Sequence, residues 1–450
     1  MTSDIAAIVL AAGHGTRMRS RQSKVLHEIG GRSMLEHVLA AAGALSPARL
    51  AVVIGDHAPE VGARARSVEP RIEVAIQAPP RGTGDAVAKA LPAIEGFEGV
   101  ALILYADTPL VRVETLRALA AAAAKSGAGA VLGFRPSDPG AYGRLVVDAE
   151  GRLQAIVEAK DASPDERRIG LCNSGVMAVD AAFLRRAIPL LSPNNAKGEY
   201  YLTDIAATAR LDGRPFAVVE GDEEEVPGVN ARGELAAAEA IFQSRARAAA
   251  MEAGATLIDP QTVYFAFDTR LGQDVVVEPG VYFGPGVVVE SGAIIRAYSH
   301  LEGARVGSGA VVGPFARLRQ GADLGEDARV GNFVEVKKTT IGRGAKANHL
   351  AYLGDATIGP DANIGAGTIT CNYDGFNKHR TEIGAGAFIG SNSSLVAPVR
   401  IGDGAYVGSG SVITKRVEAD DLAVARGRQA EIKGWAAKFR AANASKKKGD

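Results

Sequence analysis

Small, cationic and acidic residues gather where short apolar runs of this sequence end. The run Ile5–Leu10 leads into a glycine-rich loop that contains Arg17, and Lys24 follows it. Glycines let a backbone close around a phosphate, and arginine supplies planar donors, so this segment could bind the phosphates of a nucleotide. A Gly-x-Gly sequence can equally be a structural turn. It matches neither the dinucleotide-binding nor the P-loop pattern.

Two later apolar runs are followed by residues that could bind a nucleotide base and a metal ion. Gln77, Gly82 and Thr83 follow Ile72–Ile76 and offer amide and backbone groups for the edge of a base. Asp107 follows Val100–Leu104 and could bind a metal ion. An aspartate before Thr-Pro is also a common helix cap, so both interpretations stay open.

A histidine in the C-terminal half lies among residues suited to acyl transfer. A polar insertion separates Ile364-Gly365 from Ile383-Gly384, and His349 precedes it. A lone histidine is more often structural, but Arg, Lys, Tyr and Asn residues around one insertion favour catalysis. A neutral imidazole, with an ordinary pKa near ~6.5, can take a proton from an attacking amine.

The C-terminal part has an apolar residue at every sixth position. The three runs are Leu271, Val277, Phe283, Val289, Ile295 and Leu301; Val306, Val312, Leu318, Leu324, Val330 and Val336; and Ile383, Ile389, Leu395, Ile401, Val407 and Ile413. Neither a helix nor an alternating strand has this period, whereas a parallel β-helix does. Left-handed hexapeptide coils are associated with acyl transfer from acetyl-CoA, which is an analogy of fold.

The first half predicts a Rossmann-like, three-layer α/β domain with a mostly parallel sheet, because apolar runs alternate with alanine-rich segments. The expected strands are Ile5–Leu10, Leu50–Ile54, Ile72–Ile76, Val100–Leu104, Ala130–Phe134 and Gly175–Val179, and the expected helices are Ser33–Ala44, Gly84–Leu91 and Glu114–Ser126. One long helix, Asn230–Gly254, is expected to be a spacer. The predicted domains are 1–229, a linker at 230–250, and a β-helix at 251–450 with a flexible tail from Ala441 to Asp450.

The overall composition limits the classes of partner that this chain is expected to bind. The 450 residues exceed one ordinary core, and Lys+Arg and Asp+Glu balance at 51 each, so nothing favours nucleic acid or anionic membranes. Cys172 and Cys371 are too few for a disulfide framework. The apolar stretch Ile5–Ala12 has no basic leader, and no run reaches the roughly 18–20 residues that cross a bilayer. A cytoplasmic protein without membrane insertion is expected.

Ordered motifs along nearly the whole chain now give a specific resemblance. They are LAAGxGTRM…KVLH, QxxxxGTGDA, LYADTPL, AYGR, IVEAKDA, CNSGV and VPGVN. The first half resembles the sugar-1-phosphate nucleotidyltransferases. With the repeats, the chain resembles the bifunctional family that combines glucosamine-1-phosphate acetyltransferase and N-acetylglucosamine-1-phosphate uridyltransferase activities.

The resemblance implies residue roles in a first, Mg²⁺-dependent site for UTP and the sugar phosphate. The implied nucleotide-sugar ligands are Leu10, Ala11, Ala12, Gly13, Arg17, Lys24, Gln77, Gly82, Thr83, Tyr105, Ala106, Asp107, Gly143, Glu158, Asn173 and Asn230. Among them, Arg17 and Lys24 would bind phosphates, and Asp107 and Asn230 would bind Mg²⁺. The family usually has Gly at position 106 and Pro at position 23, where this chain has Ala106 and Ser23. The methyl of Ala106 could crowd the sugar or alter the backbone angle.

The resemblance also implies a second site, which lies between subunits of a homotrimer. His349 would be the general base, while Arg319, Lys337, Tyr352 and Asn363 bind glucosamine-1-phosphate. Acetyl-CoA would contact Ala366, Asn372, Tyr373, Ser391, Ser409 and Arg426, with Ser409 replacing the family's usual Ala. Independently of the resemblance, Glu335 could orient His349 or simply be solvated.

The implied product, UDP-N-acetylglucosamine, feeds bacterial cell-wall and lipopolysaccharide precursors. Two other functions stay open: a nucleotidyltransferase whose coil only regulates or oligomerises it, and a non-catalytic sugar-nucleotide sensor with a trimerising scaffold.

Overall fold

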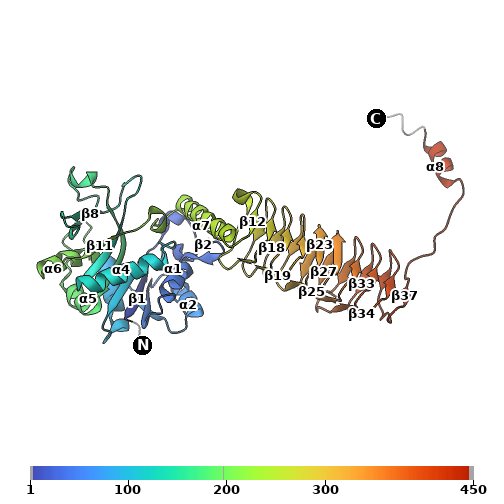
Figure 1. The fold of residues 1–450 in the computed structure, drawn as a ribbon, viewed down its shortest axis with the longest axis horizontal. Coiled ribbons are helices and arrows are strands. Elements are labelled where there is room, and N and C mark those ends of the chain that lie inside the picture. Colours follow the sequence, from blue (N-terminus) through green and yellow to red (C-terminus); the bar gives the residue numbers. More distant parts are fainter. Residues whose placement is uncertain (1–3, 196, 445–450) are drawn as a thin grey trace. The chain divides into compact units, whose positions relative to one another are not determined.

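The computed structural model describes residues 4–195 and 197–444, and its chain divides into two compact units (Figure 1). The first unit is Met1–Ala248 and the second is Ala249–Asp450. Each unit has its own architecture.

A twisted sheet forms the centre of the N-terminal unit. Within the described residues its strand order is β11-β7-β10-β6-β1-β4-β5. All neighbours on this path pair in parallel except β10, which runs antiparallel to both β6 and β7. The strands are β1 (Ile5–Ala11), β4 (Arg49–Gly55), β5 (Glu73–Gln77), β6 (Val100–Tyr105), β7 (Gly129–Phe134), β10 (Cys172–Asp180) and β11 (Ala217–Glu220). The prediction of a mostly parallel α/β sheet is confirmed.

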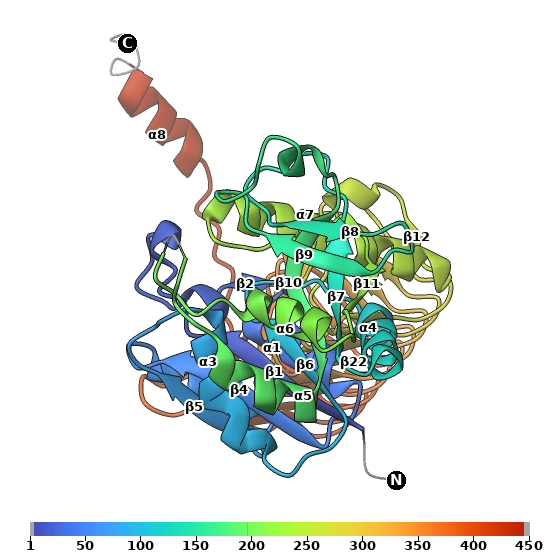
Figure 2. The ribbon, with the colours of Figure 1, turned by 90° about the vertical axis from the view of Figure 1, so that its left-hand side faces the viewer.

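Helices cover both faces of this sheet (Figure 2). Alternating β1 residues enter two separate cores: Ile8 packs with residues of α3, α5 and α6, and Val9 packs with residues of α1, α2 and α4. The helices are α1 (Met34–Gly43), α2 (Pro59–Val68), α3 (Thr83–Ala90), α4 (Val113–Ser126), α5 (Ala181–Ala187) and α6 (Ile205–Leu211). This alternation places the site-bearing loops at the strand ends, between two buried layers.

A hairpin extends the sheet beside β10. It consists of β8 (Arg144–Val147) and β9 (Leu153–Val157), and a smaller hairpin joins β2 (Glu28–Ile29) to β3 (Arg32–Ser33). Short 3₁₀ turns, among them η1 (Thr16–Met18) and η2 (Lys24–Leu26), shape the loop after β1.

The long helix α7 (Arg232–Glu252) does more than join the two halves. Its Ala238 is fully buried, and its Glu239 accepts a hydrogen bond from the Gly30 amide at 2.8 Å. Phe242 leaves no room for a side chain at Gly30, where an added Cβ would lie 2.3 Å from its ring. The expectation of a bland spacer is therefore wrong for this face, because the periodic apolar residues of α7 pack against the N-terminal unit.

The C-terminal unit is a stack of coils, each built from short strands on three faces (Figure 1). In the described part of the chain these strands form three parallel sheets. The first contains β12 (Thr256–Leu257), β14 (Val276–Val277), β17 (Ile294–Ile295), β20 (Val311–Val312), β23 (Arg329–Asn332), β26 (Lys346–His349), β29 (Asn363–Ile364), β32 (Phe388–Ile389), β35 (Tyr406–Val407) and β37 (Leu422–Ala423).

The other two sheets complete each coil. One contains β13 (Arg270–Leu271), β16 (Val288–Val289), β19 (Ala304–Val306), β22 (Ala322–Leu324), β25 (Thr339–Ile341), β28 (Ala356–Ile358), β31 (Thr381–Ile383) and β34 (Val399–Ile401). The other contains β15 (Tyr282–Phe283), β18 (His300–Leu301), β21 (Arg317–Leu318), β24 (Glu335–Lys337), β27 (Tyr352–Gly354), β30 (Ile369–Cys371), β33 (Ser394–Val396) and β36 (Val412–Ile413).

The hexapeptide residues fill the interior of this left-handed β-helix, as predicted. Val277, Val312 and Leu395 are fully buried, and Val277 stacks on Ile295 of the next coil. Each coil thus covers the apolar residues of its neighbour, which no coil could bury alone. Leu271, at the start of the first run, is only half-buried.

The chain ends beyond the coils with helix α8 (Trp435–Asn443). The expected flexible tail therefore begins within a helix, and residues 445–450 lie outside the described residues. Both cysteines are free thiols. Among the described residues, no helix is long and apolar enough to cross a membrane.

Candidate active sites

The loop after β1 brings Lys24 close to the end of the sheet. Gly15 has a φ of 60°, and a Cβ on it would lie 2.5 Å from the Cβ of Lys24. Glycine is therefore needed at position 15, for both backbone conformation and space. The Leu10 carbonyl accepts a hydrogen bond from the Ala106 amide at 3.0 Å, so the segments after β1 and β6 lie side by side. Arg17 lies exposed on η1.

Lys24, Asp107 and Asn230 form one partly buried cluster. The Lys24 Nζ donates to Asp107 Oδ2 at 2.5 Å and to Asn230 Oδ1 at 3.0 Å. The lysine side chain is only 9 % exposed and the aspartate 24 %. The Val229 amide also donates to the Asp107 carbonyl at 2.8 Å, which ties the segment before α7 to this strand end. Asp107 caps no helix, because α4 begins at Val113 with Arg112 as its N-cap.

The two side-chain oxygens of this cluster converge on one point. A carboxylate and an amide oxygen suit the hard cation Mg²⁺, which keeps open positions for phosphate oxygens and water. Within residues 4–195 and 197–444, no group of three or more His, Cys, Asp and Glu residues could hold a metal ion. A cation at Asp107 and Asn230 would therefore take further ligands from a substrate.

The residues predicted to read the base lie together after β5. Gln77 is buried, and its Nε2 donates to the Gly82 carbonyl and to Asp85 Oδ2, both at 2.9 Å. Gly82 has a φ of 106°, and an added Cβ would lie 2.6 Å from the Tyr200 carbonyl. Thr83 begins α3, and its hydroxyl accepts a hydrogen bond from the Leu202 amide at 3.1 Å. These contacts hold the segment rigid.

The three predicted sugar ligands also converge. The Asn173 amide donates to the Gly143 carbonyl at 2.8 Å, and a Cβ on Gly143 would lie 3.8 Å from Glu158 Oε1. A Cβ at position 143 would be in ordinary contact with this carboxylate, so Gly143 lies directly beside it. Burial raises the pKa of Glu158, and the Lys197 ammonium partly opposes this. Burial likewise raises the pKa of Tyr105, so its phenol stays neutral and can donate a hydrogen bond.

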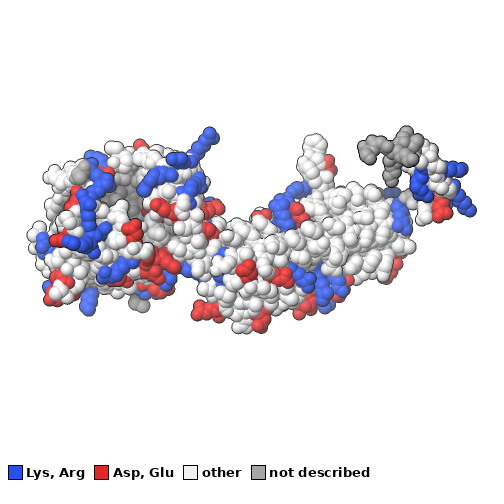
Figure 3. All heavy atoms as spheres, turned by 90° about the horizontal axis from the view of Figure 1, so that it is seen from above, with Lys and Arg blue, Asp and Glu red and all other residues white. Residues whose placement is uncertain are grey.

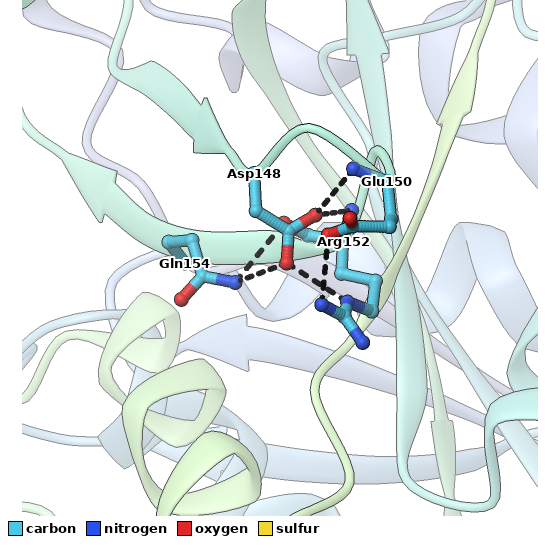
Figure 4. A network of polar contacts seen from close by, with 4 residues as sticks. All are labelled: Asp148, Glu150, Arg152 and Gln154. Carbon is cyan, nitrogen blue, oxygen red and sulfur yellow. Dashed lines mark hydrogen bonds and ion pairs between the residues drawn. The ribbon is translucent and has the colours of Figure 1, made fainter.

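The hairpin that carries two of these ligands is fixed at its turn (Figure 4). Asp148 accepts hydrogen bonds from the Arg152 amide and Nε, both at 2.8 Å, and from Gln154 Nε2 at 2.9 Å. Hydrogen bonding from Arg152 lowers the pKa of Asp148. Because Arg144 pairs with Val157, Gly143 and Glu158 lie next to each other at the open end of the hairpin.

Ala106, which departs from the resembled family, lies inside the N-terminal unit. It is fully buried in the core shared with α1 and α4. Its methyl packs in this core, which gives no support to the expected crowding of the sugar.

His349 ends strand β26 and is exposed. Its Nδ1 lies 2.8 Å from Oδ1 of Asn332, the residue that pairs with it on β23. Glu335 instead accepts a hydrogen bond from Arg319 Nη1 at 2.7 Å. The hypothesis that Glu335 orients His349 is thus wrong, because Glu335 lies on β24, in a different sheet. Sequence reasoning missed Asn332, although it lies one coil before His349, and that spacing could have found it.

A groove opens beside His349. Its volume is about 410 Å³. Its lining residues are Arg296, Val311, Gly313, Pro314, Arg329, Val330, Gly331, Asn332, Asn348 and His349. The imidazole therefore faces a space that a substrate can enter.

The predicted phosphate ligands form a positive cluster across the corner from His349. Lys378 of the insertion lies next to Lys337, and this contact, together with Arg319, lowers the pKa of Lys337. Tyr352 pairs with Glu335, and its hydroxyl and Asn372 Nδ2 both lie within 3 Å of an ideal Cβ position on Gly354. Like charges so close together are stabilised by an anionic ligand.

Four of the residues predicted to bind acetyl-CoA, Ala366, Ser391, Ser409 and Arg426, follow one another on successive coils. The Asn392 amide donates to the Ala366 carbonyl at 2.7 Å, and the Gly410 amide donates to the Ser391 carbonyl at 2.8 Å. Arg426 Nη1 donates to the Ser409 carbonyl, also at 2.7 Å. A long ligand could bind along this column, parallel to the axis of the coils.

Two further predicted ligands lie outside this column. Asn363, on β29, pairs with Lys346 of the strand that carries His349. Tyr373 lies exposed in the insertion, where its hydroxyl donates to the Gly375 carbonyl at 2.5 Å.

The fold and the two clusters define a nucleotidyltransferase domain followed by hexapeptide transferase repeats. Residues 7–188 match the MobA-like NTP transferase domain family, and residues 380–415 match the bacterial transferase hexapeptide family.

Full-length relatives identify the family. The chain is 57% identical over 448 residues to the bifunctional protein GlmU of Paramagnetospirillum magneticum, with 99% of each chain covered. It is 58% identical over 440 residues to that of Azorhizobium caulinodans, with 98% of each covered. It is also 49% identical to that of Zymomonas mobilis over 436 residues, 96% of this chain and 97% of the relative. The chain belongs to the family of the bifunctional protein GlmU.

Proposed function

We propose that this chain is a bifunctional enzyme of UDP-N-acetylglucosamine synthesis. Its C-terminal unit transfers an acetyl group from acetyl-CoA to glucosamine-1-phosphate. Its N-terminal unit transfers a uridylyl group from UTP to the N-acetylated product and releases pyrophosphate. The observation that carries this proposal is the presence of two separate reactive clusters, around Asp107 and around His349, in a chain of this family.

The uridylyl transfer brings two anions together. A phosphate oxygen of the sugar phosphate attacks the α-phosphorus of UTP, and the bond to pyrophosphate breaks. Lys24 and Arg17 neutralise phosphate charge, while Glu158, Asn173 and Gly143 hold the sugar so that attack and departure are in line. Asp107 and Asn230 would bind Mg²⁺, which would stabilise negative charge on the phosphates.

The acetyl transfer needs a base beside an amine. Asn332 Oδ1 only accepts hydrogen bonds, so the proton of a neutral His349 lies on Nδ1 and Nε2 is free to accept. As the glucosamine nitrogen attacks the thioester carbonyl, Nε2 takes the proton that the nitrogen loses. The carbon–sulfur bond then breaks, and the CoA sulfur leaves as a thiolate that receives a proton. Arg319, Lys337 and Lys378 bind the sugar phosphate.

A homotrimer is part of the proposal, because one chain leaves the second site open. Tyr298, Phe315 and Phe333 stack along one corner with ring centroids 5.3 Å apart, and Leu350 continues the column. All four are exposed and have positive φ, so the backbone turns these apolar side chains outward. Broad areas of the β-helix face drawn in Figure 3 also carry no charged side chain. Such a surface fits packing against other copies of the chain.

The substrates acetyl-CoA and UTP also support a cytoplasmic location, which is part of the proposal.

One incubation tests both activities. The purified chain is mixed with glucosamine-1-phosphate, acetyl-CoA, UTP and Mg²⁺, and the products are resolved by mass. We expect N-acetylglucosamine-1-phosphate first and UDP-N-acetylglucosamine after it. Pyrophosphate release from pre-acetylated substrate without any release of CoA thiol would favour the alternative in which the coil only regulates or oligomerises the enzyme. Binding without either product would favour a sensor.

A further inference from the structure

We propose that Lys24 is a built-in counter-ion that occupies the metal position of the free enzyme and moves to the substrate phosphates when the metal arrives with the nucleotide. This inference rests on the proposed uridylyl-transfer site. If Lys24 has this role, the site excludes a divalent cation that arrives without nucleotide and accepts the metal–nucleotide complex.

The geometry places two cations in competition. The Lys24 Nζ contacts both proposed metal ligands, at 2.5 Å from Asp107 Oδ2 and 3.0 Å from Asn230 Oδ1. Mg²⁺ binds oxygen at about 2.0–2.1 Å, so it would lie almost where the ammonium lies. The two cations cannot share this point.

Burial and charge decide which cation stays. The Lys24 side chain is 9 % exposed, so an ammonium that loses both oxygens without a new partner is strongly disfavoured. A divalent cation added to one carboxylate and one ammonium would also leave an excess charge of +2. In the free enzyme, the lysine therefore keeps the ligands.

The nucleotide changes this balance. Its phosphates offer oxygen partners to the displaced ammonium and negative charge to the metal at the same moment. Lysine carries its charge on a flexible four-carbon stem, which allows the head group to move while its backbone stays in place. Gly15 holds that backbone end, because it leaves room only for the Lys24 Cβ.

Mn²⁺ binding to the full-length chain tests this exchange without any turnover. Free Mn²⁺ is measured by electron paramagnetic resonance, first without and then with UTP. In Lys24→Met, which has a similar length and no charge, we expect bare Mn²⁺ to bind about tenfold more tightly than in the original chain, because a like charge has been removed. With UTP present, the same variant should bind Mn²⁺ more weakly, because a phosphate contact has been lost.

Two controls isolate the charge at this point. Lys24→Arg keeps a cation beside Asp107 and should keep bare Mn²⁺ binding weak. Lys125→Met removes an exposed charge at the end of α4 and should change neither measurement. Equal melting temperatures of the variants show that the fold is intact, and Lys24→Gln serves if Lys24→Met is unstable.

The possible results distinguish the role of Lys24 from the proposed metal site on which it rests. Bare Mn²⁺ affinity that is unchanged or lower in the uncharged Lys24 variants overturns the counter-ion role while leaving the proposed metal site intact. If Asp107→Ala binds Mn²⁺ normally in the presence of UTP, the metal site itself is wrong. Opposite shifts without and with UTP support the exchange, since a purely structural lysine would not produce them.

Discussion

The two sites of this protein differ in how far a single chain encloses them. In the N-terminal unit, the segments after β1, β5 and β6 meet the start of β10 and the segment before α7, and Lys24 and Asp107 are largely buried. In the C-terminal unit, the corresponding groups lie on the outside of the coils, and His349 and Arg426 are exposed. A sheet gathers its strand ends into one cleft, whereas a solenoid repeats an outer face and needs an insertion or another copy to enclose a ligand. The first site should therefore work in an isolated chain and the second should not.

Replacing His349 should produce the largest difference between the two activities. In His349→Ala, acetyl transfer should fall by about 10²–10⁴-fold because the general base is lost. Pyrophosphate release should not change. Thiol release and pyrophosphate release are measured on one preparation. His300→Ala, at another exposed histidine of the coil, should affect neither activity. A parallel fall of both activities in His349→Ala would contradict the independence of the sites.

Asp107→Ala should give the reverse pattern. Uridylyl transfer should fall by about 10²–10³-fold, because the carboxylate that would hold Mg²⁺ at the phosphates is lost. Acetyl transfer, followed by thiol release, should be unchanged. Asp165→Ala, at an exposed carboxylate of the same unit, is the matched control. Full uridylyl transfer in Asp107→Ala would remove this residue from the site.

Breaking the subunit contact should affect only the open site. Phe333→Glu places a charge in the apolar column and should dissociate the proposed trimer, with acetyl transfer reduced about tenfold or more, equivalent to ~1.4 kcal/mol. Light scattering gives the oligomeric state, and both activities are followed on the same sample. Leu190→Glu, at an exposed leucine of the N-terminal unit, should leave assembly unchanged. A monomer with full acetyl transfer would show that one chain suffices.

The contact between Asn332 and His349 should have a smaller effect. Removing this hydrogen bond in Asn332→Ala should lower the kcat of acetyl transfer about tenfold, because the imidazole is no longer held in one orientation. The KM for acetyl-CoA should stay the same. Asn332→Asp keeps an acceptor oxygen and should restore most of the activity. If KM rises while kcat is unchanged, Asn332 binds substrate rather than orienting the base.

Replacing Glu158 should have the smallest effect, and the size of this effect depends on pH. Because burial raises its pKa in the folded state above 4.5, the folded chain binds this proton more tightly than the unfolded chain does. The contribution of Glu158 to stability therefore falls as pH rises from 4.5 through the raised pKa. Glu158→Gln should increase the midpoint of thermal unfolding at pH 8 by about 2 °C and lose this gain below pH 4.5.

The same Glu158→Gln variant should raise the KM for the sugar phosphate in uridylyl transfer, while acetyl transfer stays unchanged. Glu150→Gln, on the exposed turn of the same hairpin, controls for the loss of charge. A lower midpoint of unfolding at pH 8 would show that the carboxylate stabilises the fold, contrary to the raised pKa.

The sequence predicted the fold where one periodicity dominates. The sixth-position residues, such as Val312 and Leu395, could be placed inside the coils because every coil repeats the same burial. Strand–helix alternation similarly predicted the α/β sheet. The antiparallel direction of β10 had no local signal, since direction depends on the path of the chain between strands.

Side-chain partners were harder to predict than the set of candidate residues. The ordered motifs selected Lys24, Asp107 and Asn230, but no motif says that the lysine Nζ lies between the two oxygens. Glu335 looked suitable as a partner of His349 because it is close in sequence and acidic. Asn332 has that place, since residues one coil apart meet on the same sheet while near neighbours in sequence can lie on another.

What the sequence determined by itself is the kind of structure and the kind of chemistry: hexapeptide coils, an α/β sheet, and two sets of reactive side chains. Only the tertiary structure decided which members of each set touch, that α7 packs on the N-terminal unit, and that the first site is buried while the second is open. The reason is that periodicity and residue type act locally along the chain. Contact and burial depend on elements far apart in sequence, which come together only when the chain folds.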